Sequence, residues 1–374
     1  MLQNKIYLNY LKEIFQTFFA ILFGLTLIAL TVRAVSFLDL IVENGYPINV
    51  YFQYSFLNLF GIATKFIPFS FLLSITIFIG KHINDKELII LWSSGVNKIS
   101  LVNLFLFVSI LIFILNLIIS SILAPYTLYK SRLLLSDEQI NSILPAVRIQ
   151  QFSDTFKGLT FIVSKKKNNE VQDIFLHDGG GNLKNLSPDI NDSSVTTIIA
   201  KSGYIDKTKF FLFDGQLIST KINGDKNDVI KFEQMNLDMG DLNTTTIKKP
   251  KIQETSTLKL LDCFITKKLD KFCNENAKKE MTSILNRRMV MPFYIPVIAL
   301  ISSLLLINSN SKLLNRSLVF GYGFVLLIFA EMIVRYTGLY SLVRISFLII
   351  PIFLIIFFYL FLNYKFSQKE LINE

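Results

Sequence analysis

The sequence predicts an α-helical integral membrane protein with six transmembrane helices, grouped three plus three around an inserted all-β, jelly-roll-like domain. Hydrophobic residues make up 52% of the 374 residues, which is too apolar for a water-soluble chain. Charged residues make up only 18%, and long stretches of the chain carry none. The middle of the chain is polar and has short β-forming runs between turn residues. We therefore assign residues 1–124 and 281–374 to the membrane part and residues 125–280 to the insert.

Six apolar stretches are long enough, or nearly so, to cross about 30 Å of hydrocarbon. They cover residues 15–38, 56–79, 99–123, 290–307, 318–334 and 345–362, of which the fourth and fifth are short. The first stretch is not a cleavable signal peptide, because its apolar run is too long and no small-x-small cleavage site follows it.

The short loops predict that both termini are cytoplasmic and that the insert lies outside the cytoplasm. Lys and Arg gather in the N-terminal tail, in the loops after the second and fourth spans and in the C-terminal tail: Lys5, Lys12, Lys81, Lys86, Lys98, Lys312, Arg316, Lys365 and Lys369. The loop after the first span has Asp39 and Glu43 but no Lys or Arg. The basic stretch 267–288 falls on the outer side. It belongs to a long translocated domain, and the positive-inside rule, by which Lys and Arg are enriched in cytoplasmic loops, constrains such a domain only weakly.

The insert opens with a helical continuation of the third span over residues 126–140. Six β-forming runs follow, at 159–163, 171–176, 195–199, 209–213, 216–220 and 229–235. Turns are predicted at 179–182, at Asp214-Gly215 and at 223–225. Strands this closely spaced, with no long helix among them, indicate an antiparallel sandwich or jelly roll. The glycines at 179–181 lack a following helix and a P-loop lysine, so they predict a turn and not a phosphate site.

The sequence predicts no catalytic residue, no cofactor and no metal site. It has no Walker A motif, no metal-ligand spacing and no nucleophile elbow. The net charge of +10 does not predict nucleic-acid binding, because no basic helix alternates with exposed aromatic residues. Cys263 and Cys273, ten residues apart in a segment predicted to be outside the cytoplasm, are either a disulfide or two unpaired thiols.

The loop between the second and third spans predicts a short amphipathic helix. Residues 87–93 have helical spacing, and Gly95 follows as a stop signal. The candidate contact residues on this helix are Glu87, Leu88, Leu91, Trp92 and Gly95. A helix with one charge at its start and the only Trp suits a groove in a cytoplasmic ATPase. The alternative is that this helix lies on the lipid interface, and physical arguments alone do not decide between the two interpretations.

Ionisable residues within or beside the spans form a second set of candidates, because charges at such depth are costly and usually face a cavity. They are Arg33, Lys65, Arg287, Arg288, Glu331, Arg335 and Arg344. We interpret Arg33, Lys65 and Arg335 as contacts to an anionic lipid headgroup, and Arg288 and Arg344 as side chains that snorkel to ordinary phospholipid. Glu331 and Arg335, four residues apart, could pair on one helix face.

The chain resembles the LptF/LptG permease subunits of the bacterial lipopolysaccharide-export ABC transporter over essentially its whole length. The likeness is carried by the span and insert order and by four motifs: Glu87-Leu88 with Gly95-Val96, Asp173-Ile174-Phe175-Leu176, Ala200-Lys201-Ser202-Gly203 and Asn286-Arg287-Arg288. Asn44-Gly45-Tyr46-Pro47 and Gln150-Gln151-Phe152 favour the F-type over the G-type subunit.

The resemblance implies an inner-membrane protein that extracts lipopolysaccharide from the outer leaflet. Its partners would be a cytoplasmic ABC ATPase dimer, a paralogous permease subunit and a periplasmic jelly-roll bridge protein, with no nucleic acid. The coupling helix near residues 85–95 would dock on the ATPase through Glu87. The first and fifth spans would line a lateral gate where Arg33 and Arg335 meet lipid phosphates. The β-domain would receive acyl chains and pass them on by edge-to-edge strand pairing.

Two other functions fit parts of the pattern. A mechanotransmitting ABC permease would share the coupling helix but would need no cations facing a cavity. A membrane-anchored sensor or assembly scaffold normally needs a cytoplasmic output domain, for which tails of about a dozen residues leave no room.

Overall fold

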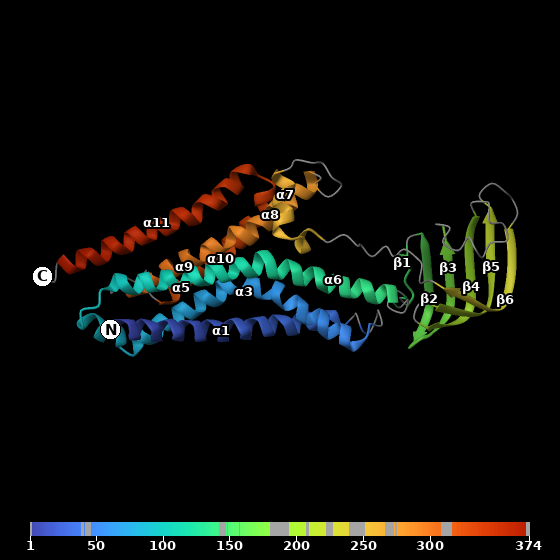
Figure 1. The fold of residues 1–374 in the computed structure, drawn as a ribbon, viewed down its shortest axis with the longest axis horizontal. Coiled ribbons are helices and arrows are strands. Elements are labelled where there is room, and N and C mark those ends of the chain that lie inside the picture. The colour runs from blue at the N-terminus through green and yellow to red at the C-terminus, as the bar shows by residue number, and fades with distance from the viewer. Residues whose placement is uncertain are drawn as a thin grey trace. The chain divides into compact units, whose positions relative to one another are not determined.

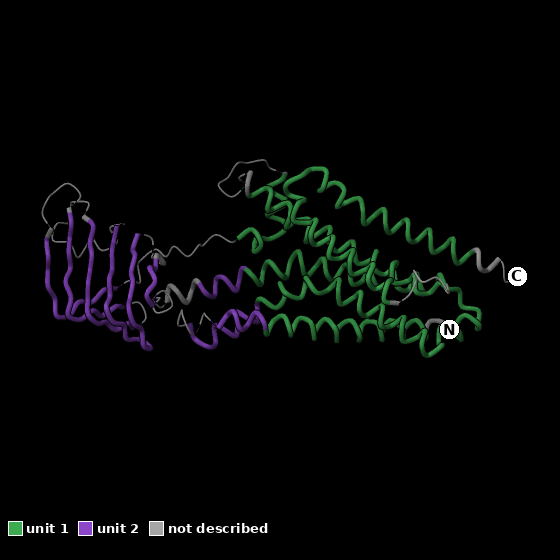
Figure 2. Tube along the Cα trace, turned by 180° about the vertical axis from the view of Figure 1, so that it is seen from behind, with its two compact units in different colours: residues 1–31, 58–128, 251–374 green, residues 32–57, 129–250 purple. Residues whose placement is uncertain are grey.

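The computed structural model describes residues 2–38, 41, 46–141, 147, 149–156, 158–179, 194–206, 209–221, 227–238, 251–265, 273, 275–307 and 316–371. The chain divides into two compact units. Unit 1 comprises residues 1–31, 58–128 and 251–374, and unit 2 comprises residues 32–57 and 129–250 (Figure 2). Residues 251–280, which the sequence analysis assigned to the insert, thus group with the membrane helices.

Among the described residues, six helices are long and apolar enough to cross a membrane, which confirms the predicted spans (Figure 1). The first three spans are α1 (Leu2–Phe37), α3 (Ile48–Asn84) and α5 (Lys98–Ile118), and α5 continues through a π-helical turn (Ile119–Leu123) into α6 (Ala124–Asn141). The last three are α8 (Glu275–Met289) with α9 (Tyr294–Ser303), α10 (Arg316–Val334) and α11 (Ser341–Leu371). The fourth span is longer than predicted, because the polar helix α8 runs into the apolar helix α9 through a 3-10 turn (Met291–Phe293).

Helix α9 is the centre of unit 1. Every residue from Tyr294 to Ser303 is buried, and α5, α10 and α11 pack against this helix. A helix that is apolar all round belongs in an interior. The first and sixth spans, by contrast, leave most of their apolar side chains exposed or half-buried within this chain, as surfaces that meet lipid or another subunit do.

The short helix predicted between the second and third spans is present as α4 (Glu87–Ser93). Two residues with positive φ bound it, Lys86 at 58° and Gly95 at 86°. A glycine in this conformation ends a helix at little steric cost, which is why the sequence signal was reliable.

The insert forms one six-stranded antiparallel sheet whose strands follow chain order, and its predicted all-β class is confirmed. The strands are β1 (Ser153–Phe156), β2 (Leu159–Lys167), β3 (Glu170–Asp178), β4 (Ser194–Asp206), β5 (Lys209–Lys221) and β6 (Asn227–Asp238). Side chains that alternate along the strands, among them Phe161, Val163 and Leu176, form its core. The turns predicted at 179–182 and 223–225 lie largely or wholly outside the described residues.

The turn predicted at Asp214-Gly215 is wrong, because both residues lie inside β5. Asp214 has a φ of 50°, yet the pairings of Phe213 with Ser202 and of Gly215 with Ala200 continue on either side. An added Cβ at Gly215 would lie 2.4 Å from a ring carbon of Phe232, so this glycine permits a close approach of β6 and not a chain reversal.

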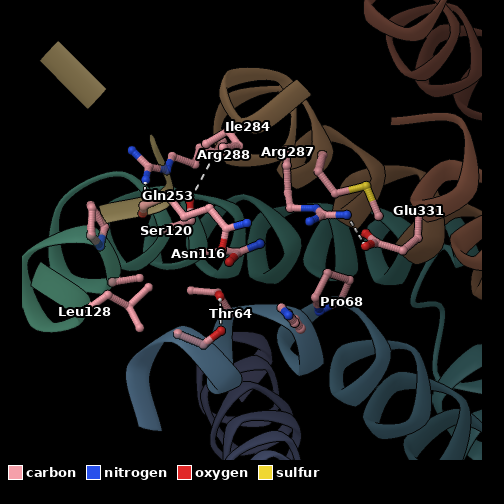
Figure 3. Close-up of a pocket in the computed structure, with 15 residues that line it drawn as sticks. Thr64, Pro68, Asn116, Ser120, Leu128, Gln253, Ile284, Arg287, Arg288 and Glu331 are labelled. Atoms are coloured by element: carbon pink, nitrogen blue, oxygen red, sulfur yellow. Dashed lines mark hydrogen bonds and ion pairs between the residues drawn. The ribbon is translucent and has the colours of Figure 1, made fainter. Parts of the chain in front are cut away.

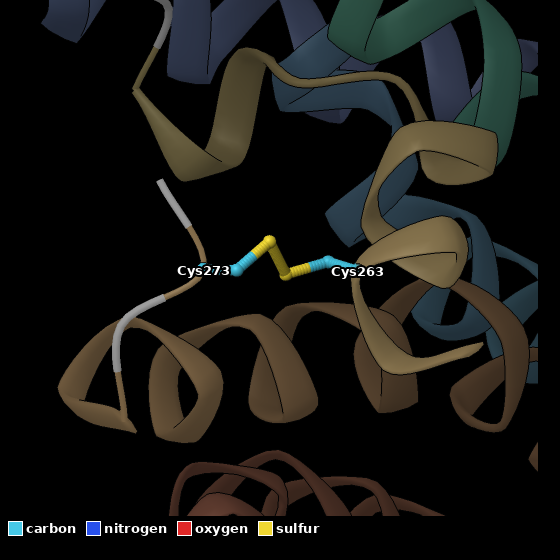
Figure 4. Close-up of a disulfide and its surroundings, with 2 residues drawn as sticks. All are labelled: Cys263 and Cys273. Carbon is cyan, nitrogen blue, oxygen red and sulfur yellow. A yellow bond between two sulfur atoms is a disulfide. The ribbon is translucent and has the colours of Figure 1, made fainter. Parts of the chain in front are cut away.

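Cys263 and Cys273 form a disulfide bond, which answers the question that the sequence left open (Figure 4). Cys263 lies on α7 (Thr257–Ile265), and α7 packs on α8 through a small core that includes Leu260, Met281 and Leu285. The bond therefore ties the end of α7 to the chain that enters α8.

Candidate functional site

A pocket of about 190 Å³ lies within unit 1, among α3, α5, α6, α8 and α10 (Figure 3). We call it the Arg287 pocket. Its polar or charged lining residues are Thr64, Lys65, Asn116, Ser120, Gln253, Arg287, Arg288 and Glu331. A cavity of this size has room for several waters or a small polar group.

Contacts to backbone carbonyls hold α8 against the end of α10 and so bring Arg287 and Glu331 to the pocket. The Ser283 hydroxyl donates to the Val334 carbonyl at 3.0 Å. An added Cβ at Gly338 would lie 2.0 Å from the Lys279 carbonyl oxygen, so only glycine permits this approach.

Arg287 forms an ion pair with Glu331 across the pocket. The predicted pairing of Glu331 with Arg335 is therefore wrong in the described part of the chain. A spacing of four residues places two side chains on one helix face. It cannot predict that Glu331 pairs with Arg287, which is 44 residues away in the sequence. Arg335 instead begins a 3-10 helix (Arg335–Gly338), is exposed and does not line the pocket.

Several polar atoms that face this region lack a hydrogen-bond partner among the described residues. Arg287 Nε is a buried donor without an acceptor, and Asn116 Oδ1 is a buried acceptor without a donor. Pro68 has no N–H, which leaves the carbonyl of Thr64 without its usual helical donor. Buried groups of this kind normally find a partner, so the pocket is suited to a bound molecule that both donates and accepts.

Arg288 has a different environment from its neighbour Arg287. Its side chain is buried and donates to the carbonyls of Gln253 and Thr255 at 2.7 and 2.8 Å and to the hydroxyl of Thr257 at 3.1 Å. The prediction that Arg288 snorkels to phospholipid is therefore wrong. Its role is to fix the segment leading into α7 against α8.

The remaining predicted lipid contacts fall in different places. Lys65 lines the Arg287 pocket, one turn before Pro68 on α3. Arg33 is exposed on α1 and belongs to unit 2, so it is not part of this pocket. Arg344 is exposed on α11, as a snorkelling side chain would be.

A second ionic constellation lies where α3 ends and α4 begins. It consists of Glu13, Lys81, His82 and Glu87, and we call it the His82 cluster. Lys81 Nζ lies 2.6 Å from Glu13 Oε1, and His82 Nε2 lies 3.2 Å from Glu13 Oε2. His82 Nδ1 contacts Glu87 Oε2. The sequence analysis missed Glu13 and His82, because no spacing rule connects α1 with α3.

The predicted contact residues of α4 divide into two groups. Leu88 and Leu91 are buried in the helical core, and Trp92 packs against it. Glu87 is about half exposed, and the adjacent Ile89 and Ile90 are exposed. Ile89 and Ile90, which the sequence analysis did not single out, are thus the apolar residues that α4 offers to another molecule.

The comparisons with known proteins agree with this architecture. The model of one family, described as lipopolysaccharide export system permease LptF/LptG, matches residues 9–365. No curated protein matches the chain. The matched range includes all six spans and the β insert.

Proposed function

Because the chain belongs to the LptF/LptG family of lipopolysaccharide export system permeases, we propose that it is the transmembrane subunit of an ABC transporter that extracts lipopolysaccharide. The observation that carries this proposal is the match over residues 9–365, which covers the spans and the insert together. The lipid would leave the outer leaflet of the inner membrane and pass to a periplasmic bridge protein. ATP hydrolysis would belong to a partner ATPase dimer, and a paralogous permease would complete the membrane part. We assign this chain to the F-type from Gln150-Gln151-Phe152.

In the proposed topology both termini and α4 are cytoplasmic and the β insert is periplasmic. The Lys residues around α4, among them Lys81 and Lys86, support the cytoplasmic side for this end of unit 1. The disulfide between Cys263 and Cys273 supports an oxidising compartment for the other end.

In this function, the Arg287 pocket would bind an anionic group of the lipid. Arg287 and Lys65 supply cations, and the Nε of Arg287 supplies a donor that has no acceptor among the described residues. Without lipid, Glu331 would pair with Arg287. When lipid binds, a phosphate would replace Glu331 as the partner of Arg287, since the planar guanidinium group binds carboxylate and phosphate in the same way. Exposed Arg33 and Arg335 would meet phosphates at the lateral gate.

The coupling surface would be the exposed side of α4. Glu87 offers a charge, and Ile89 and Ile90 offer an apolar patch that fits a groove in the ATPase. In the insert, β6 is one outer strand of the sheet and the longer of the two outer strands, so it is the edge on which a partner strand could be added.

The experiment that tests the function is a mild-detergent pulldown of the tagged chain, with mass spectrometry of the proteins and lipids recovered. We expect an ABC ATPase, a second six-span permease and lipopolysaccharide. Recovery of the ATPase without lipopolysaccharide would favour a mechanotransmitting permease. Recovery of neither would favour a membrane scaffold.

Variants of the pocket test the lipid site in the same pulldown. Arg287→Ala should lower the lipopolysaccharide recovered per complex about tenfold, roughly the loss of one charge-assisted contact. Glu331→Gln should raise it, because Arg287 is then released from its internal anion. Arg344→Ala removes an exposed arginine outside the pocket and is the matched control. Equal lipid recovery in all three variants and the parent chain would contradict this assignment.

A further inference from the structure

His82 is a buried side chain that lies between two carboxylates of different helices. Its side chain is 3% exposed. On one side Nε2 faces Glu13 of α1, and on the other side Nδ1 faces Glu87 at the start of α4. The ring centroids of Phe78 and Tyr10 lie 4.2 and 4.9 Å from that of the imidazole, so the ring is packed among aromatic side chains. Each of its two nitrogens has a carboxylate partner.

Each carboxylate of the cluster is bound in a different way. Glu13 is held through both oxygens, by Lys81 and by His82. Glu87 gives Oε2 to His82, and its side chain is 48% exposed. Glu87 is thus held from inside the protein and is open to a cation from outside.

Helix α4 is built to move as one piece. It has seven residues, and residues with positive φ lie immediately before it and just after it. Leu88 and Leu91 anchor it to the core by apolar contact, which has no direction. The Glu87–His82 contact, by contrast, depends on distance and angle. A displacement of α4 would therefore be passed to α3 and α1 along the direction of this contact.

Helix α1 is in turn arranged to respond. Its buried apolar side chains Tyr10, Ile14 and Phe18 are all in its first half, close to Glu13. Within this chain only 11% of the most apolar stretch of the first span is buried, against 89% of that of the fourth. A displacement applied near Glu13 therefore meets little packing resistance along the rest of the helix.

We propose that His82 is a positioning residue that transmits displacement of the coupling helix α4 to the first span, through the chain of contacts Glu87–His82–Glu13. The proposal rests on the proposed function, in which a partner ATPase displaces α4. It adds that Glu87 has two partners, a cation of the ATPase and the internal imidazole. Movement of α1 would then follow the nucleotide cycle.

The test compares ATP hydrolysis with lipopolysaccharide release in the full purified complex in proteoliposomes. His82→Phe keeps an aromatic ring against Phe78 and Tyr10 but removes both hydrogen bonds. We expect the complex to assemble and to hydrolyse ATP within about twofold of the parent rate, while lipopolysaccharide released per ATP falls about tenfold. His82→Gln, which retains one donor, should restore part of the ratio. Lys12→Gln removes an exposed charge from α1, next to Glu13, and should leave the ratio unchanged.

Glu13→Gln examines the same contact from α1 without altering the packing around His82, and it decides the matter if His82→Phe fails to assemble. A normal ratio of release to hydrolysis in Glu13→Gln, or in an assembled His82→Phe complex, overturns the inference and leaves the proposed function intact. Absence of any ATPase from the parent complex would instead defeat the proposed function itself.

Discussion

The His82 cluster and the Arg287 pocket both depend on α3, yet they satisfy their charges in opposite ways. Lys65 and His82 are 17 residues apart, about 26 Å along the helix. In the His82 cluster both ring nitrogens and both oxygens of Glu13 have partners inside the protein. In the Arg287 pocket, the Nε of Arg287 has no acceptor in the described part of the chain and lies beside open volume.

This difference separates transmission from binding. A charge network whose members are all paired within the protein resists change and moves as a body. A network that leaves a buried donor and a buried acceptor unpaired gains free energy when a ligand supplies the missing partners. The two regions thus suit the two tasks of a transporter subunit, to receive movement and to hold cargo.

The largest effect is expected for Arg288→Ala. This change leaves the carbonyls of Gln253 and Thr255 without their donor and should lower the free energy of unfolding by about 3–5 kcal/mol, since each hydrogen bond from a charged group contributes about 1.5–3 kcal/mol. Arg287→Ala, at the adjacent position, breaks a half-exposed ion pair and should cost at most about 1 kcal/mol. Thermal unfolding in detergent measures both. Equal losses would mean that the two arginines do not divide into structural and binding roles.

The next effect concerns the disulfide that supports the α7–α8 side of the pocket. Cys263→Ser should destabilise unit 1 by about 3 kcal/mol, since the bond closes a loop of roughly eleven residues in the unfolded chain. A reductant should lower the melting temperature of the parent chain but not that of the variant. A parent chain isolated with two free thiols would place this segment in a reducing compartment and contradict the proposed topology.

A smaller effect is expected from the coupling of Glu13 and Glu87 through His82. Glu13→Gln and Glu87→Gln should be non-additive in unfolding free energy by about 1 kcal/mol, because both carboxylates contact the same imidazole. The pair Glu331→Gln and Glu87→Gln, which lies in the two separate regions, should be additive. Additivity in both pairs would mean that His82 does not connect α1 with α4.

The smallest effect comes from Lys166 in unit 2, a cation whose charge is bonded to the carbonyl of Val147 at 3.1 Å. Burial lowers the pKa of the Lys166 ammonium below its usual value of 10.5. The folded chain therefore binds fewer protons than the unfolded chain in the alkaline range below that value, and stability should rise with pH there. Lys166→Met should remove this rise, whereas Lys165→Met, at an exposed position, should retain it. A parallel pH profile in all three chains would exclude the burial effect.

Hydropathy and turn chemistry predicted the membrane helices, α4 and the β insert, because these depend on residues that are neighbours in the chain. The helix α4, for example, follows from Glu87 at its start and Gly95 past its end. The sequence did not predict the partners of ionisable side chains. Glu331 pairs with a cation on a remote helix, and His82 contacts a carboxylate on another. Nor did it distinguish Arg287 from Arg288, because the environment of each depends on how α8 packs.

The third span contains the π-helical turn Ile119–Leu123, from which Ser120 donates to the carbonyl of Arg288. Such a turn is equivalent to one extra residue in an α-helix, so it offsets the faces of α5 and α6 by about 100°. The residues before and after the turn can therefore change independently over evolution, each under the constraints of its own neighbours. A homologue with an unbroken third span would align to this chain only with a one-residue gap in the middle of the membrane, and that gap would mark the loss of the serine facing Arg288.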